Sequence, residues 1–126
     1  GRLAPLGYGL AQFAQTLGPA FDDTVVLVLS EFGRTARQNG NGGTDHGHGN
    51  VMWLLGGTVA GGRVHGRWPG MDDAALHEGR DLAITTDFRA VLAQLLERHL
   101  RLSDAQLQAV LPQWRGGDAG LPPLVA

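Results

Sequence analysis

The chain has 126 residues, a net charge of −2, and basic and acidic side chains mixed along its length. This length fits one domain or part of one, and the charge gives no electrostatic footprint for nucleic acid or an anionic membrane. The absence of cysteine excludes disulfides, zinc–thiolate sites and thiol catalysis, and no apolar run approaches the roughly 20 residues that span a bilayer.

The first predicted element is an amphipathic helix. Its apolar stripe recurs at steps of three and four residues, at Leu3, Leu6, Leu10, Phe13 and Leu17. Gly18-Pro19 ends this helix, since glycine suits the left-handed cap position and proline cannot continue a helix. The chain begins without Met and enters the helix at once, so we expect that further sequence precedes it.

A buried strand is predicted at Thr24–Leu29. This run has no polar alternation, which is typical of a strand covered on both faces in a parallel sheet. A helix followed by such a strand is half of a doubly wound α/β unit, in which ligands bind beyond the carboxyl ends of the strands. Residues 30–35 leave the strand at that edge, so we expect them to line a site.

A glycine-rich middle region follows. Residues 39–50 form a long polar loop, and Val51–Leu55 is a second apolar strand. Gly56-Gly57 and Gly61-Gly62 bracket a short segment before residues 63–65, which favours a hairpin or strand–turn–strand there.

Two more helices are predicted toward the end of the chain. Asp87, after two threonines, supplies an N-cap for a helix that runs to about His99. Ser103 and Gln106 have the capping-box spacing for a last helix through Leu111.

The strongest candidate for chemistry is Asp45-His46-Gly47-His48. Imidazole and carboxylate are usual ligands for zinc, manganese or iron, and His46 and His48 would share a face of an extended segment. Glycines at 47 and 49 let the backbone approach closely and adopt positive φ. We therefore predict that Asp45, His46 and His48 bind metal; the alternative is a surface loop in which they only cap turns.

Ser30–Thr35 is the second candidate. Glu31, at the carboxyl end of the predicted strand, could be a metal ligand, a general base or a partner that orients a histidine. Arg34 could hold an anionic substrate through two parallel hydrogen bonds. We predict catalytic roles for Glu31 and Arg34; the alternative is a Glu31–Arg34 salt bridge that fixes a turn.

Other polar residues carry weaker signals. Arg67 beside Trp68 could contact an anion, although a stacked surface pair is favoured. The glycine-rich loop is neither a P-loop nor a dinucleotide fingerprint, because no Gly-Lys-Ser/Thr follows it and no Gly-x-Gly-x-x-Gly opens a helix. The remaining weak candidates are His65, His77, Arg80, Asp81 and His99.

Together these stretches resemble a bacterial family. Residues 25–35 (VVLVLSEFGRT), 39–50 (NGNGGTDHGHGN), 56–70 (GGTVAGGRVHGRWPG) and 79–99 (GRDLAITTDFRAVLAQLLERH) are similar to the C-terminal third of proteins known as domain of unknown function 1501. That family is grouped with the alkaline phosphatase and sulfatase superfamily. The resemblance implies a three-layer α/β/α fold with a mostly parallel sheet, present here as a C-terminal fragment. The fold would cover residues 1–115 and leave an irregular tail at 116–126.

The resemblance also implies a chemistry. It implies a divalent metal (zinc, manganese or calcium), hydrolysis or transfer of phosphate or sulfate esters, and therefore an anionic ester substrate. The N-terminal remainder of the same protein would be a further partner. Export, often on an upstream twin-arginine signal, would place the protein in the periplasm or outside the cell.

The match of site residues is incomplete. Superfamily members commonly end a core strand with Ser-Asp-His-Gly, whose Asp and His bind metal, whereas Ser30–Gly33 reads Ser-Glu-Phe-Gly. Glu31 could still ligate, but Phe32 cannot, so one metal site is altered or absent. His46 or His48 matches a metal-binding histidine that the superfamily places in a glycine-containing loop, and Asp45 could compensate for the lost ligand. No part of the chain matches the nucleophile or the first metal-binding Asp.

Three functions remain open from the sequence. The first is part of a metal-dependent hydrolase, inactive by itself because half of the ligands lie elsewhere. The second is a non-catalytic member of the same fold that binds a glycan, a cell-surface polymer or a protein, motivated by Phe32. The third is a small α/β domain whose glycine loop is a mobile connector, which the length of the loop disfavours.

Overall fold

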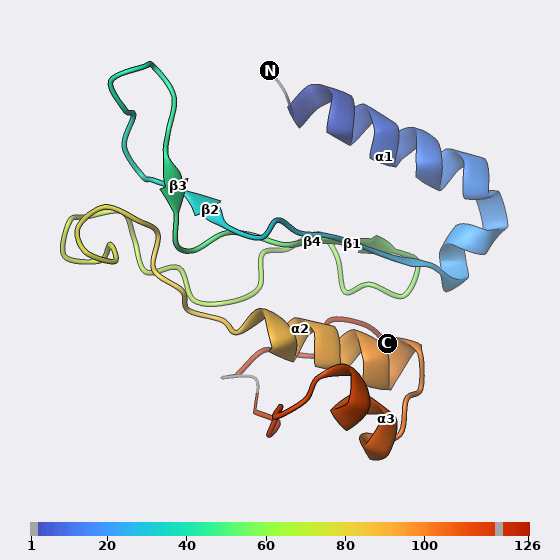
Figure 1. Ribbon diagram of the computed structural model, residues 1–126. Helices are drawn as coiled ribbons and strands as arrows, with labels where there is room; N and C mark the ends of the chain where they lie inside the picture. Colours follow the sequence, from blue (N-terminus) through green and yellow to red (C-terminus); the bar gives the residue numbers. More distant parts are fainter. Residues whose placement is uncertain (1–2, 118–119) are drawn as a thin grey trace.

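The computed structural model describes residues 3–117 and 120–126. Its elements are α1 (Leu3–Leu17), the 3-10 helix η1 (Gly18–Asp23), strands β1 (Val25–Val28), β2 (Gly33–Arg34), β3 (His46–Gly47) and β4 (Trp53–Gly56), helix α2 (Phe88–Gln94), the π-helical η2 (Leu95–His99) and α3 (Asp104–Val110). Figure 1 shows α1 on one side of the strands, with α2 and α3 on the other.

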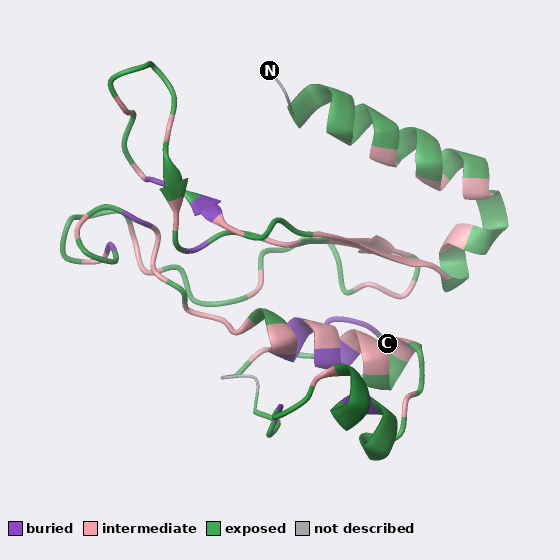
Figure 2. Ribbon diagram, in the orientation of Figure 1, coloured by how far each residue is buried: buried purple, intermediate pink, exposed green. Residues whose placement is uncertain are grey.

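The first helix forms as predicted, but it lies open. Gly18 follows its last residue with φ of 54°, a left-handed conformation that glycine adopts readily, and Pro19 comes next. No residue of α1 is buried, and Leu3 and Tyr8 are 67% and 70% exposed. In Figure 2 the helix is almost entirely in the colour of exposed residues. The described part of the chain therefore covers the apolar side chains of α1 only partly.

The strands form one long, irregular hairpin. β1 pairs antiparallel with β4, with Val25 opposite Gly56, and β2 pairs antiparallel with β3, with Gly33 opposite Gly47. The register shifts by one residue between the two ladders, because residues 48–52 are one residue longer than residues 29–32. The polar loop that we predicted after the first strand is the tip of this hairpin.

The predicted three-layer α/β/α fold with a mostly parallel sheet is wrong. The described chain forms three α-helices and two antiparallel sheets of two strands each. A run of apolar residues without alternation indicates that both faces of a strand avoid water, but it does not fix the direction of the neighbouring strand. Here the two apolar runs fold back on each other, and Val25–Val28 are half-buried rather than fully covered.

The helices at the end of the chain follow their sequence signals. The Asp87 side chain accepts a hydrogen bond from the Arg89 backbone N–H and so caps α2, which with η2 reaches the predicted end at His99. Ser103 and Gln106 form the predicted capping box at the start of α3. These local hydrogen bonds explain why the boundaries were readable from sequence.

The core lies between these helices and the tail. Its buried members are Ala90, Ala93, Leu107 and Trp114. The tail adds buried Leu124 and Val125, and Val59 forms a β-bridge to Val125 instead of the hairpin predicted within residues 56–65. Residues 120–126 form no helix or strand, yet they close one side of the core.

No helix in the described part of the chain is long and apolar enough to cross a membrane.

Candidate functional site

The two predicted site segments lie side by side, because β2 belongs to the first and β3 to the second. Gly33 and Gly47 allow the backbones of these two segments to touch, and Gly49 allows the second segment to touch the backbone of Leu82. A β-carbon on Gly33 would lie 1.7 Å from the carbonyl oxygen of Gly49, one on Gly47 would lie 2.3 Å from the Arg34 carbonyl carbon, and one on Gly49 would lie 2.6 Å from the Leu82 carbonyl oxygen. None of these three has positive φ, so the expectation of positive φ at 47 and 49 is wrong. Close approach of the backbone is what requires glycine there.

Polar side chains fasten the tip of the hairpin. The Asn39 side chain accepts hydrogen bonds from the backbone N–H groups of Asn41 and Gly43 and donates to Asp45 Oδ1 at 2.8 Å. Asp45 also exchanges hydrogen bonds with Thr35, whose Oγ1 accepts from the Asp45 N–H at 3.1 Å. These hydrogen bonds hold Asp45 in the loop, and its predicted role as a metal ligand stays a prediction.

Arg34 crosses the hairpin instead of pairing with Glu31. Its Nε donates to Thr44 Oγ1 at 2.9 Å, and its Nη2 donates to the Thr44 carbonyl oxygen. Glu31 is exposed and accepts a hydrogen bond from Ser30 Oγ at 3.2 Å. The two predicted catalytic side chains are thus bound to different neighbours, and their functional roles stay predictions.

The two histidines have different ring partners. His46 packs against Phe32, with ring centroids 3.9 Å apart and planes tilted by 34°. His48 stacks on His77, with centroids 4.1 Å apart and planes only 10° from parallel. Both histidines remain exposed residues in this arrangement.

His77 belongs to a tight turn that contacts the hairpin. The His77 and Asp81 backbones exchange two hydrogen bonds around Glu78 and Gly79, which both have positive φ (53° and 65°). The hairpin docks on this turn through β-bridging of Thr35 with Asp81 and through a hydrogen bond from the Gly49 N–H to the Leu82 carbonyl. The turn therefore fixes where His48 can lie.

Asp81 is the only carboxylate among the described residues that is buried, at 3% exposure. Arg80 Nη2 donates to its Oδ2 at 3.0 Å, and this hydrogen bond raises the pKa of the Arg80 guanidinium, with the charge of Asp81 adding to the effect. Arg80 Nε lies 2.9 Å from Oδ1 without the geometry of a hydrogen bond, so Oδ1 has a charged neighbour but no donor. A buried carboxylate is tolerated here because Arg80 remains beside it.

The described residues do not by themselves assemble a full set of metal ligands. Within residues 3–117 and 120–126, no three His, Asp or Glu side chains come close enough together to hold a metal ion. Asp45 is tied to Asn39, and the rings of His46 and His48 face different neighbours. The donors have the right chemistry for a divalent cation, but their number and placement do not fit a full ligand set.

The chain matches a protein-family description over residues 1–112, nearly its whole length. That description reads "Protein of unknown function (DUF1501)". The chain belongs to this family. No curated protein matches it, and no solved structure matches it. The family predicted from the four sequence stretches is confirmed, and its description assigns no activity.

In this DUF1501 chain, the pairing that the sequence did not reveal is that of His48 with His77. The two residues are far apart in sequence, and His77 is one of the weaker candidates in the sequence. The one local indication of this fold is Glu78-Gly79. A glycine at this place favours a tight turn, which brings the backbone segments on its two sides together.

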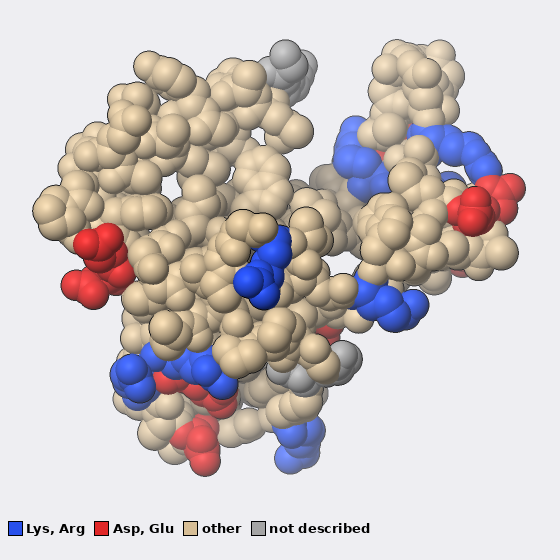
Figure 3. All heavy atoms as spheres, turned by 180° about the vertical axis from the view of Figure 1, so that it is seen from behind, with Lys and Arg blue, Asp and Glu red and all other residues tan. Residues whose placement is uncertain are grey.

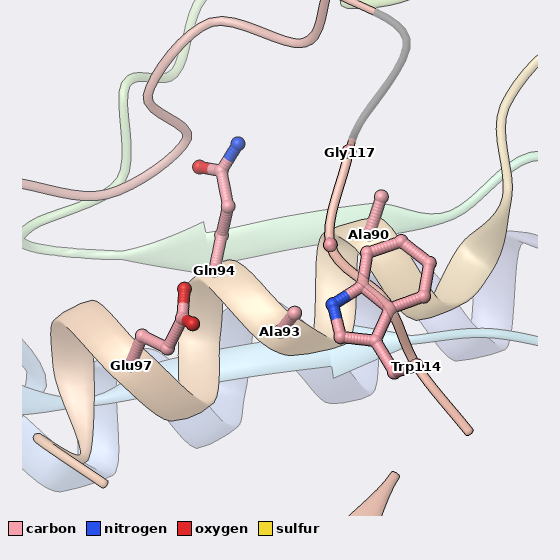
Figure 4. A pocket seen from close by; sticks show the side chains of 7 residues that line it. Ala90, Ala93, Gln94, Glu97, Trp114 and Gly117 are labelled. Carbon is pink, nitrogen blue, oxygen red and sulfur yellow. The ribbon is translucent and has the colours of Figure 1, made fainter. Parts of the chain in front are cut away.

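A hollow of the DUF1501 chain lies in the C-terminal corner, away from the hairpin. It has a volume of about 230 Å³ and is lined by Ala90, Ala93, Gln94, Glu97, Trp114, Gly116 and Gly117. Figure 4 shows the Gln94 and Glu97 side chains rising from the helix beside the Trp114 ring. The Gln94 amide accepts from the Leu124 N–H and donates to the Pro122 carbonyl, so it serves to hold the tail. The hairpin therefore remains the better candidate for a functional site.

Proposed function

We propose that this chain is the C-terminal part of a metal-dependent phosphate- or sulfate-ester hydrolase-like protein, and that the hairpin β2–β3 contributes to its site. The observation that supports the proposal is the antiparallel pairing that sets Gly33 and Arg34 against Gly47 and His46. It brings the two polar segments together and leaves the His46 and His48 rings exposed.

The proposal assigns this chain only part of the ligand set. His46 and His48 are the proposed metal ligands, and further ligands with the nucleophile would come from the N-terminal remainder. When bound, a divalent cation would stabilise negative charge on phosphoryl or sulfuryl oxygens. Arg34 is proposed to contact the anionic ester, for which it must leave Thr44 or share its guanidinium N–H groups.

Metal uptake tests this proposal. We expect the chain to bind Zn²⁺ or Mn²⁺ weakly, as measured by isothermal titration calorimetry, because two imidazoles are fewer protein ligands than the three or four that zinc sites use. The variant His46→Ala/His48→Ala should lose this binding. The control His65→Ala/His99→Ala removes the same number of imidazoles elsewhere and should retain it. Equal binding by both variants would contradict the assignment.

Phe32 favours one alternative function. Its ring occupies the position of a ligand in the superfamily's motif and packs against His46 at 3.9 Å. A non-catalytic member of the family that binds a glycan or a protein through this hairpin would have such an aromatic surface. In a longer protein that contains this chain, absence of metal together with no turnover of p-nitrophenyl phosphate or sulfate would support this alternative.

A further inference from the structure

The tip of the hairpin carries two Asn-Gly pairs, Asn39-Gly40 and Asn41-Gly42. Such a pair is chemically labile, because glycine has no β-carbon to hinder the approach of its backbone nitrogen to the asparagine side chain. In Figure 3 the tip projects from the body of the molecule at the upper right, and residues 38–44 contain no charged side chain. The two pairs are alike in sequence, so an unfolded chain should react equally at both.

The reaction of such a pair needs only the chain and water. The backbone nitrogen of the glycine bonds to the side-chain carbonyl carbon of the asparagine. The bond from that carbon to Nδ2 breaks, and ammonia leaves with the proton of the glycine N–H. Water then opens the succinimide ring at either of its carbonyls, which gives aspartate or isoaspartate. Ring closure requires that the asparagine side chain can rotate toward the next residue.

The fold holds the side chain of Asn39 by three hydrogen bonds. Its Oδ1 accepts from the backbone N–H groups of Asn41 and Gly43, each at 3.0 Å, and its Nδ2 donates to Asp45 Oδ1 at 2.8 Å. Asn39 is also half-buried. Rotation of this side chain breaks these hydrogen bonds, so the tip must open locally before Asn39 can react.

The side chain of Asn41 is not held in this way. Asn41 is exposed, and in the part of the chain that the structure describes its side chain makes no hydrogen bond. One contact opposes the reaction, because the Gly42 N–H donates to the Asn39 carbonyl oxygen at 3.2 Å. Reaction at Asn41 therefore breaks one long hydrogen bond, whereas reaction at Asn39 breaks three.

The third asparagine of the chain is held on both sides. Asn50 Nδ2 donates to the Phe32 carbonyl oxygen, and its Oδ1 accepts from the Val51 N–H, both at 2.8 Å. The next residue, Val51, is β-branched, which hinders access to its backbone nitrogen. Asn50 is therefore an internal reference that should not react.

We infer that Asn41 is a site of spontaneous deamidation, and that the fold directs this modification to Asn41 and away from Asn39. The product places a carboxylate on the uncharged tip, and isoaspartate also lengthens the backbone by its β-carbon. Both changes lie next to the Asn41 N–H that donates to Asn39 Oδ1, so the modification should loosen the hydrogen bonds of Asn39. This modification is independent of the proposed metal site.

Incubation in mildly alkaline buffer, followed by peptide mass spectrometry, tests the site. Electron-transfer fragmentation locates the amide that has become an acid and distinguishes isoaspartate from aspartate. In the folded chain, Asn41 should react on the order of 10-fold faster than Asn39, because more hydrogen bonds protect Asn39. Asn50 should stay intact. In guanidinium chloride the two Asn-Gly pairs should react at similar rates, which would assign the difference to the fold.

Matched variants separate the hydrogen bonds of Asn39 from the charge of the loop. Asp45→Ala removes the acceptor of Asn39 Nδ2 and should accelerate the reaction of Asn39 by roughly 2- to 10-fold, with little change at Asn41. Asp73→Ala removes a carboxylate that pairs with Arg37 outside the tip, and should leave both rates unchanged. Equal rates at Asn39 and Asn41 in the folded chain would overturn the inference. So would an Asn41 that stays intact while the unfolded chain reacts.

Discussion

The C-terminal corner and the hairpin are held together by different forces. In the corner, side chains from α2, α3 and the tail pack around Trp114. In the hairpin, the two backbones are in contact at Gly33 and Gly47, and side-chain hydrogen bonds hold the tip. The corner should therefore respond to the loss of side-chain volume, and the hairpin to the addition of a single methyl group.

The largest expected effect is in the corner. Trp114→Ala should lower the free energy of unfolding by about 3–5 kcal/mol, because it removes a buried aromatic ring and leaves a cavity. It also removes the ring over which the Arg89 guanidinium lies at 5.5 Å from the centroid. Urea denaturation measures the loss. Trp68→Ala is the control, since Trp68 is 66% exposed and should change stability by less than about 0.5 kcal/mol.

In the hairpin, adding a side-chain atom rather than removing one should destabilise the protein. Gly33→Ala should destabilise the protein by roughly 1–3 kcal/mol, because its new β-carbon would overlap the Gly49 carbonyl and force the strands apart. Gly40→Ala adds the same methyl group at the tip, where nothing lies within 4 Å, and should be nearly neutral. Thermal unfolding compares the two variants. Similar melting temperatures would mean that the hairpin backbones are not in contact.

The cap of α2 tests a local contribution to the corner. Asp87→Ala should cost about 1 kcal/mol, the usual value for a lost N-cap, while Asp87→Asn should cost less because asparagine also caps helices. Urea denaturation at neutral pH measures both. Equal losses would place the effect in the ion pair with Arg89 rather than in the cap.

The same residue gives a pH dependence. Hydrogen bonding from the Arg89 side chain lowers the pKa of Asp87 below its ordinary value of 3.8. The unfolded chain therefore takes up a proton at Asp87 before the folded chain does, and stability falls as pH decreases from about 4 toward the lower folded pKa. In Asp87→Asn this part of the acid destabilisation should be missing. If the difference in unfolding free energy between the variant and the parent chain stays the same from pH 5 to about pH 2, the assignment of this pH dependence to Asp87 is contradicted.

The smallest expected effect is in the turn beneath the hairpin. Glu78 has φ of 53°, which is strained for a residue with a side chain but common for asparagine or glycine in tight turns. Glu78→Asn should stabilise the protein by about 0.5–1 kcal/mol. Asn41→Asp at the tip changes the charge by the same amount in the opposite direction, and a loss of stability of similar size there would assign the effect to charge instead.

Sequence predicted the local features of this molecule well. Asp87, Ser103 and Gly18 mark helix ends through hydrogen bonds or backbone conformations that involve only neighbouring residues, and all three predictions are confirmed. The family was predicted correctly because four stretches in order carry it. These features depend on residues close together in the chain.

Long-range features were not readable from the same patterns. The direction of the strand beside Val25–Val28 depends on which segment returns to it, and no residue of that run encodes this direction. The stacking of His48 on His77 requires the intervening chain to fold back, and Gly47 and Gly49 proved to be contact points rather than positions of positive φ. The hydrogen bond from the Asn39 side chain to the Asp45 carboxylate was likewise not predicted from the sequence.

The central functional claim is that the hairpin is the cation-binding part of this chain, and its histidine rings can report on it directly. The chain has five histidines, and nitrogen-15 NMR resolves their imidazoles during addition of Zn²⁺. The account predicts that the rings of His46 and His48 shift first, together with His77, which is stacked on His48. Shifts confined to His65 and His99, or no shift in any ring, would contradict it.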